Sequence, residues 1–572
     1  MFLFSLAWAS SVQPCHRSHE ISASVGHSAT GLTQRSRGLY GLCVALLCAL
    51  IALACGSAVA VEADILKQLG SDDFDEKATA IEAILARPDP TTLPVLKALQ
   101  DGALHVDGQG GGWIKSDGQV IDARTGQPAT MPSPEPDEVM INNNLRGQID
   151  AAMASLKLFS PDRATRLAAA RALQEGDDDS ILPILRKAQA QESDADVKQA
   201  VTLAAAAIAL KSEDAAQRLA AAQALAASDR EQIRTALAAM VEQRADGSWV
   251  EPDPAVRTAA RASLAEVSAR LSRAEWFGRI FAGLSLGSIL MLAAIGLAIT
   301  YGLLGVINMA HGEMIMIGAY ATYATQSVFR AVMPDAFAWY PVVALPVAFV
   351  VAAAVGILIE RTVIRWLYGR PLETLLATWG VSLILIQAMR QLFGPQNVEI
   401  ENPPWLSGGL QFGSLVMPYN RIAIIVFALA VLAAVALILN RTRLGLFVRG
   451  VTQNRQMASA VGVPTDRIDM MAFGLGSGIA GLAGVALSQV GNVGPELGQS
   501  YIIDSFIVVV LGGVGQLMGT VVAGFGLGVA NKLLEPWLGA VIAKIIILAL
   551  IIAFIQKRPS GLFALKGRAV EN

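Results

Sequence analysis

Cysteine is nearly absent from this sequence. The chain of 572 residues has four, Cys15, Cys43, Cys48 and Cys55, and none follows position 55. This distribution excludes a thiol-ligated metal site, a redox pair and a disulfide framework from the body of the protein. Charge is also scarce, because 16% of the residues are charged and 53% are hydrophobic, whereas an ordinary soluble protein is about 25% charged. The shortage of charge indicates a membrane protein.

Two further absences narrow the function. No G-x-x-x-x-G-K-[ST] sequence occurs, so the chain does not bind a nucleotide through a Walker loop. The net charge is −3 and there is no basic tract, which argues against nucleic-acid binding. The polar half has no nucleophile–base pair and no carboxylate cluster with metal-ligand spacing, and His105 stands alone there. We therefore expect a protein that is not an enzyme and has no metal or cofactor of its own.

The few charges divide the chain into two halves. Residues 276–572 carry 18 Lys and Arg against 12 Asp and Glu, whereas residues 1–275 carry 26 against 35. The first half is polar and acidic, and the second is apolar and mildly basic. The fold class we expect is mainly α, with a polytopic helical membrane domain at 276–572 behind a polar region.

Residues 1–60 have the pattern of a targeting segment. Arg35 and Arg37 precede an apolar run at 41–54, and Ala58-Val59-Ala60 fits a signal-peptidase site. The apolar run has 14 residues, whereas a membrane-spanning helix needs about 20. An uncleaved anchor and a lipoprotein site at Cys55 are the alternatives. We expect the region that follows, 61–275, to be exported.

One pattern recurs within 61–275: an acid, then an Ala-rich helix that ends in Leu. It occurs at Asp162–Leu173, Asp214–Leu225 and Asp253–Leu264. Repeats of about 35–50 residues are typical of stacked helix pairs of the HEAT or armadillo kind. An acid in front of a helix caps it and complements its dipole. The sequence predicts an α-solenoid-like domain.

The helical pattern stops at about 101–144. Closely spaced glycines, Asp117-Gly118 and Thr125-Gly126 predict tight turns between short strands, and Pro132, Pro134 and Pro136 predict a stiff linker. We expect a small β insertion here. It is either a plain surface insertion or a contact patch for a soluble partner, anchored by Trp113.

Two long uncharged windows in the membrane half predict broken helices. The window 280–312 has 33 residues, about 50 Å of helix against a membrane core of about 30 Å. It must therefore break, and Gly302, Gly305 and Gly312 are the candidate positions. The window 505–531 has Gly512-Gly513-Val514-Gly515 in its middle. Transporters use interrupted helices of this kind to line a substrate site near the midplane.

Basic loops give the expected orientation. Arginines gather near 361–370 and at 441–467, and Lys557, Arg558, Lys566 and Arg568 follow the last helix, so these places and the C-terminus should be cytoplasmic. Residues 61–275 and the loop 394–420 should then be periplasmic. About eight or nine membrane segments are expected, some of them broken or re-entrant: 280–303, 306–327, 341–364, 372–393, 421–439, 468–490, 502–513, 516–533 and 540–556.

Polar residues inside these segments are the candidate substrate pathway. Asn308, His311 and Glu313 follow the first break, and on a helix Asn308 and His311 would share a face. A later segment supplies Thr378, Ser382 and Gln387. The alternatives are that the first group satisfies the backbone freed by the break and that the second helps helices to pack.

The basic loop 441–467 is the second candidate site. It predicts a short helix of small residues, Ala458–Gly462, which ends before Pro464. A plain linker needs no such helix, whereas docking into a groove on a cytoplasmic partner does. The candidate docking residues are Arg449, Asn454, Ala458, Ala460 and Gly462.

Several of these motifs, in this order, resemble the branched-chain amino acid permease family of ABC importers. They are Tyr301–Glu313, Pro371–Ser382, Ala460-Val-Gly462 and Phe506–Gly515, and the resemblance covers about 276–568. It implies a heterodimer with a second permease subunit, two cytoplasmic ATPase subunits that bind ATP and Mg²⁺ and dock on the 441–467 loop, a periplasmic solute-binding protein, and a place among the lipids of the bacterial inner membrane.

The exported extension, with Trp113 and Asn142–Arg146, resembles the urea-importer permease within that family, so urea is the expected substrate. A branched-chain amino acid or a short-chain amide is the alternative, because a path lined by Asn, Thr, Ser and Gln suits these solutes too. A passive solute channel would need no docking loop. A membrane-tethered sensor would need an output domain, and none follows Gln556.

Overall fold

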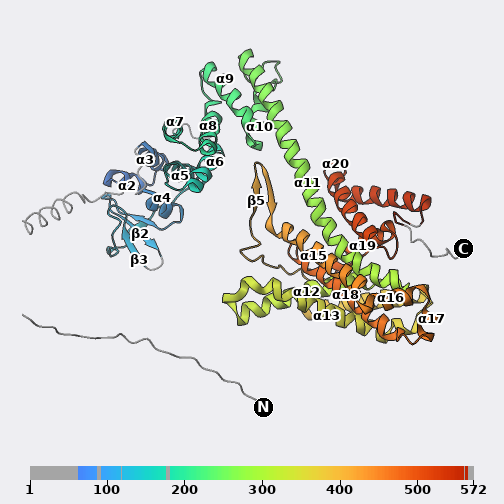
Figure 1. Cartoon of the computed structure of the whole chain (residues 1–572). Coiled ribbons are helices and arrows are strands. Elements are labelled where there is room, and N and C mark those ends of the chain that lie inside the picture. Colours follow the sequence, from blue (N-terminus) through green and yellow to red (C-terminus); the bar gives the residue numbers. More distant parts are fainter. Residues whose placement is uncertain (1–61, 87–91, 117–118, 176–180, 560, 564–572) are drawn as a thin grey trace, which may run out of the picture. The chain divides into compact units, whose positions relative to one another are not determined.

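The computed structural model describes residues 62–86, 92–116, 119–175, 181–559 and 561–563 (Figure 1). The expected targeting segment at 1–60, with all four cysteines, lies outside these residues. The chain forms two compact units, Met1–Ile208 and Ala209–Asn572. The domain boundary expected between 275 and 276 falls inside one continuous helix, α11 (Pro254–Leu304).

The first unit is helical with one small sheet. Its helices bury their Ala- and Leu-rich faces in a common core. The antiparallel sheet has the order β3-β2-β1-β4 and occupies the expected insertion. The elements are α2 (Ala63–Leu69), α3 (Phe74–Ala86), α4 (Leu93–Gln100), β1 (Leu104–Val106), β2 (Gly112–Ser116), β3 (Gln119–Asp122), β4 (Asp137–Glu138), α5 (Asn143–Lys157), α6 (Arg163–Ala172), α7 (Leu182–Gln191) and α8 (Ala195–Ala209).

The acid that begins the repeated pattern is a helix N-cap in each of the three copies named above. Asp162 accepts from Thr165 N at 2.8 Å, before α6. Asp214 accepts from Ala216 N at 2.9 Å, before α9 (Ala215–Ala224), and Asp253 accepts from Ala255 N at 2.7 Å, before α11. An Arg four residues after each cap donates to two backbone carbonyls in front of it. The repeat therefore has one local geometry, and its stacking into a solenoid stays a prediction.

Among its described residues, the second unit contains six helices that are long and apolar enough to cross a membrane: α11, α13, α14, α15, α18 and α20. Its elements are α9, α10 (Glu231–Met240), α11, α12 (His311–Val332), α13 (Tyr340–Thr362), α14 (Pro371–Phe393), β5 (Gly409–Phe412), β6 (Leu415–Pro418), α15 (Tyr419–Arg441), α16 (Arg443–Gln453), α17 (Arg455–Ala460), α18 (Thr465–Ser488), α19 (Leu497–Gly512) and α20 (Leu517–Lys557). Gly539, with φ +74°, divides α20 into two helices, where the sequence places the end of one segment and the start of the next.

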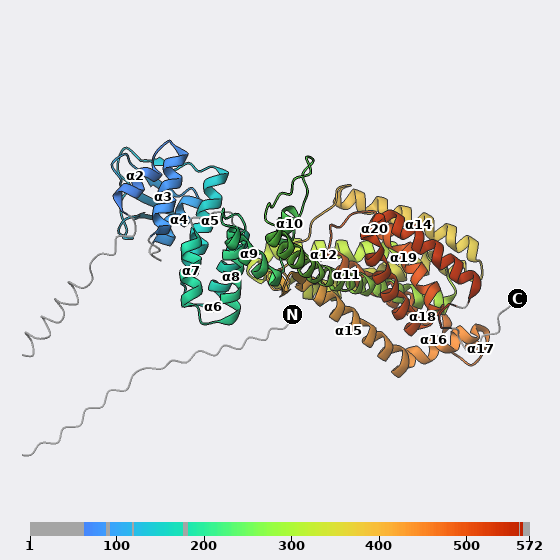
Figure 2. The ribbon, with the colours of Figure 1, turned by 90° about the horizontal axis from the view of Figure 1, so that it is seen from above.

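Helix α18 is the centre of this unit and packs against α11, α12 and α13 (Figure 2). The contacts are backbone to backbone because α18 presents glycines: a methyl group on Gly481 or Gly484 would overlap α13 or the carbonyl of Ile315 on α12. Small residues permit this close approach in membranes. Helices α14 and α15 lie at the periphery (Figure 2), and few of their side chains are buried.

Candidate functional site

Both predicted helix breaks are present, and they lie against each other. Helix α11 ends at Gly305, whose φ of +68° is left-handed, and α12 begins six residues later at His311. After α19, Gly513 and Gly515 take φ of +99° and +82° before α20 begins. A methyl group on Gly302 would lie 2.7 Å from Gly515 Cα. The two interruptions therefore meet within the helix bundle.

Gly312 is not a break residue, contrary to expectation. It lies in the first turn of α12, where a methyl group would meet Gly498 O at 2.6 Å. Its small size serves helix packing, because the backbone has already turned at Gly305.

A buried polar cluster follows the first break. Asn308, His311 and Glu313 are 2%, 0% and 1% exposed. The sequence predicted that Asn308 and His311 share a helical face. They do not, because Asn308 lies in the non-helical link before α12. Its Oδ1 accepts from Ala310 N at 3.0 Å, and His311 Nε2 lies 3.0 Å from Ala293 O on α11. The break therefore aims short polar side chains into the core of the unit.

Helix α14 completes the cluster. Thr378 Oγ1 accepts from Met309 N at 3.1 Å, and Ser382 Oγ donates to Glu313 Oε1 at 2.8 Å. Both pairs are 69 residues apart, so the link before α12 and the first turn of α12 run in the same direction as α14. Thr378 and Ser382 thus meet the residues after the first break across one seam.

Gln387 does not join them. Its side chain is exposed on α14, because it follows Ser382 by five residues and is rotated away from the face that Thr378 and Ser382 share at a spacing of four.

Three polar atoms of the cluster have no hydrogen-bond partner among the described residues: Asn308 Nδ2, His311 Nδ1 and Glu313 Oε2. Buried groups of this kind normally have partners, and each unpaired one costs about 1–3 kcal/mol. One is a donor, one an acceptor, and the imidazole nitrogen is either, according to tautomer. The cluster can therefore hydrogen-bond a small solute that carries both donors and acceptors.

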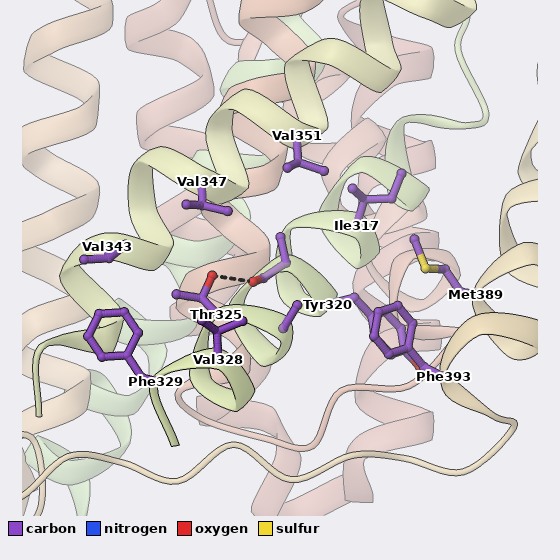
Figure 3. A pocket seen from close by; sticks show the side chains of 12 residues that line it. Ile317, Tyr320, Thr325, Val328, Phe329, Val343, Val347, Val351, Met389 and Phe393 are labelled. Carbon is purple, nitrogen blue, oxygen red and sulfur yellow. Dashed lines mark hydrogen bonds between the residues drawn. The ribbon is translucent and has the colours of Figure 1, made fainter. Parts of the chain in front are cut away.

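The same seam becomes apolar further along. Ile317, one turn after Glu313, begins a groove between α12, α13 and α14 with a volume of about 470 Å³ (Figure 3). Valines of α13 line it, with Met389 and Phe393 of α14, and Phe393 stacks on Tyr320 at 4.7 Å between ring centroids. Thr325 bonds its hydroxyl back to Ala321 O, so it offers the groove no free donor (Figure 3). The groove fits an aliphatic group.

The candidate docking residues lie on α16, α17 and the link after them. Helix α17 spans Arg455–Ala460, so it begins three residues before the predicted Ala458–Gly462 and ends before Gly462, whose φ is +88°. Asn454 caps it by accepting from Met457 N at 2.9 Å, and Ala458 is buried beneath it. Arg449 donates to Leu439 O at the end of α15.

The exposed side of this segment includes an apolar part at α17 and the residues after it. Met457 and Val461 are 60% and 74% exposed, next to the exposed Ala460 and Gly462. We call residues 443–462 the docking segment. Sequence analysis missed the groups that hold it in place, Glu360, Tyr368 and Asp469, because they come from other elements.

Known proteins resemble the membrane half of the chain. Residues 279–555 match the family model described as "Branched-chain amino acid transport system / permease component". The high-affinity branched-chain amino acid transport system permease protein LivH of Salmonella typhimurium is 31% identical over 291 residues, which cover 50% of this chain and 94% of that protein. BraD of Pseudomonas aeruginosa is 31% identical over 49% of this chain and 93% of its own length. LivM of Escherichia coli K12 is 26% identical over 44% and 63%. No solved structure matches the chain.

Proposed function

This chain belongs to the family of branched-chain amino acid transport system permease components, and we propose that it is the membrane-spanning subunit of an ATP-driven importer in the bacterial inner membrane. A second permease subunit pairs with it, a periplasmic binding protein delivers the solute, and two ATPase subunits dock on the cytoplasmic side. These subunits hydrolyse ATP, and this chain changes conformation.

The observation that carries the proposal is the polar seam between α12 and α14. It lies beside two helix interruptions, and its free donor and acceptor are buried. Interrupted helices around unpaired polar groups are how transporters hold a solute near the membrane midplane. The exposed apolar side of the docking segment supplies a contact for the ATPase subunits.

A branched-chain amino acid is the first candidate substrate. The relatives LivH and BraD are named for its transport. The apolar groove begins one helical turn from Glu313, so one solute could place polar groups in the cluster and a branched aliphatic group in the groove.

Urea, or a short-chain amide, is the second candidate, and a different observation favours it. Among the described residues from 276 onward, no Lys or Arg is buried. The carboxylate of an amino acid therefore has no cation to receive it at depth, where an unpaired charge is costly. Urea carries no net charge and can use all three free atoms of the cluster. The extension of this chain also lies outside the alignment to LivH, which covers 50% of the chain.

The uptake of leucine and urea distinguishes the two. The importer is assembled with its partner subunits in proteoliposomes and given radiolabelled leucine or urea. ATP is supplied either on the side of the membrane where the ATPase subunits lie or on the opposite side. ATP-dependent leucine uptake that excess urea does not reduce supports the first candidate, and the reverse supports the second. Uptake of either solute without ATP would overturn the proposed importer and indicate a passive channel.

Docking is tested by a charge placed on the exposed side of α17. Ala460→Glu should reduce uptake about tenfold or more, because a buried unpaired charge at an interface costs well over 1.4 kcal/mol. Ser414→Glu, on the exposed loop between β5 and β6, is the matched control and should leave uptake unchanged. Normal uptake by Ala460→Glu at normal membrane abundance would remove the docking assignment.

A further inference from the structure

The docking segment is tied to the helix core by one buried charge cluster. Arg455, the first residue of α17, contacts the carboxylate of Asp469, in the second turn of α18. Its guanidinium lies 4.5 Å from the ring centroid of Tyr368. Tyr368 Oη in turn donates to Glu360 Oε1 on α13 at 3.3 Å. Arg455 therefore contacts Asp469 of α18 directly and is linked to Glu360 of α13 through Tyr368.

The burial of Asp469 makes the loss of its partner costly. The side chain of Asp469 is 0% exposed, and that of Arg455 is 39% exposed. Removing one partner from a buried pair leaves an uncompensated charge in a medium of low polarity, which is far more costly than losing a surface pair. A flat guanidinium also stacks on an aromatic face, which an ammonium does less well.

The partner helix is suited to transmit movement. Helix α18 meets α11 and α12 through backbone contacts: Gly476 packs on Gly296, Gly481 on Gly318, and Gly484 on Ile315. Such contacts leave no side chains that could yield when α18 shifts. The far end of α18 is held as well, because Asn420 Nδ2 donates to Gln489 O at 3.0 Å. Displacement at Asp469 therefore reaches the start of α12, where the polar cluster lies.

We propose that Arg455 is a positioning residue, a latch that makes α17 move as one body with α18 and so converts movement of the docked ATPase subunits into movement of the polar seam. The proposal rests on the proposed function for its consequence in transport. The latch itself is a property of this chain and can be tested alone.

The chain offers a matched control. Arg365, in the short turn Ile364–Trp366 after α13, pairs with Asp466, one turn before Asp469 on α18, at 3.0 Å, but their side chains are 49% and 66% exposed. An exposed pair of this kind contributes little. Loss of Arg365 therefore removes the same charge from the same side of the protein without touching the buried cluster.

The first experiment uses the purified full-length chain in detergent, with its four native cysteines replaced by serine and a nitroxide spin label at Met457→Cys. Arg455→Ala should increase the mobile fraction of the label, and Arg365→Ala should not. A label at Leu446→Cys on α16, also exposed, should stay unchanged in both. An unchanged label at Met457→Cys in Arg455→Ala would overturn the latch, whatever the protein transports.

The second experiment measures solute imported per ATP hydrolysed by the assembled importer. Arg455→Ala should lower this ratio about tenfold, within the usual range of coupling between sites, while basal ATP hydrolysis persists. Arg455→Lys should recover part of the loss, and Arg365→Ala should match the unmodified chain. A full ratio in Arg455→Ala, or an equal loss in Arg365→Ala, would overturn the latch.

A double variant guards against misfolding. Arg455→Met with Asp469→Asn removes both charges, so no unpaired ion is left inside the protein. It should return to normal abundance in the membrane and still import poorly for each ATP hydrolysed. Restored coupling in the double variant would overturn the proposal. Absence of ATP-dependent uptake in the unmodified importer would instead remove the proposed function, and the spin-label result would stand.

Discussion

At the scale of single residues, Asn308 has two separable roles. Its Oδ1 satisfies the backbone at the helix break by accepting from Ala310 N, and its Nδ2 has no partner among the described residues. The oxygen belongs to the fold, and the free donor is available to a solute.

Two substitutions separate these roles. Asn308→Leu removes both groups and leaves Ala310 N unpaired, so it should destabilise the protein by about 1–3 kcal/mol and lower its membrane abundance. Asn308→Ser keeps a short oxygen that can accept from a backbone N–H and removes only the amide. It should retain abundance and lose uptake rate. Quantitative membrane blots with radiolabelled uptake check both; full uptake by Asn308→Ser would assign Asn308 to structure alone.

Which polar residues lie near the membrane core could be predicted at this scale, but not their partners. Asn308, His311 and Glu313 are identifiable because charge and amide are rare in their window. The pairing of Glu313 with Ser382 spans 69 residues and depends on how α14 packs. Gln387 lies apart from the cluster for the same reason: its polarity does not show which face of α14 it occupies. The cluster around Arg455 has no local signal at all.

At the scale of elements, the positions at which helices end could be predicted from the sequence. The glycines named in the two uncharged windows include the breaks at Gly305 and Gly513, since left-handed backbone favours glycine. The break at Gly539 was predicted only as the gap between two segments. Other glycines, such as Gly312, Gly481 and Gly484, do not end a helix but allow two helices to pack closely. Sequence does not separate the two uses, because contact is set by the neighbouring helix.

Two glycine substitutions test the close packing of α12 against α18. Gly484→Ala would drive a methyl group into the carbonyl of Ile315, so α12 and α18 must separate, at about 1–3 kcal/mol for overpacking. Gly526→Ala, on the exposed side of α20 with no neighbour within 4 Å, should be neutral or stabilising by up to about 1 kcal/mol. Thermal unfolding in detergent compares them. An equal Tm for both variants would contradict the close packing of α12 against α18.

At the scale of the whole molecule, α11 joins the polar part of the chain to the apolar part. It has 51 residues, about 76 Å of helix, more than twice the membrane core of about 30 Å. Its start is capped like the helical repeats, and its end is the first break. Trp276 packs edge-on against Trp537 at 6.1 Å, and aromatic residues of this kind mark a membrane–water interface. The sequence divided the halves at this interface by composition, but the helix runs through it.

Orientation is a property of the whole chain, and arginines at both ends of the membrane part bear on it. Several arginines of α11 precede its membrane part, yet Arg270 is bonded to Ala226 O and Ser228 O, and Arg279 is paired with Glu275. The arginines of the docking segment are mostly exposed, so the positive-inside rule predicts that this segment is cytoplasmic.

In a chain with its native cysteines changed to serine, Ser133→Cys should react with a membrane-impermeant maleimide in intact spheroplasts. Met457→Cys should react only after the membrane is opened, because we propose that α17 faces the ATPase subunits in the cytoplasm. Both sites are exposed in the described structure, so access and not burial decides the labelling. Reaction of Met457→Cys in intact cells would invert the orientation and, with it, the side on which ATPase subunits can dock.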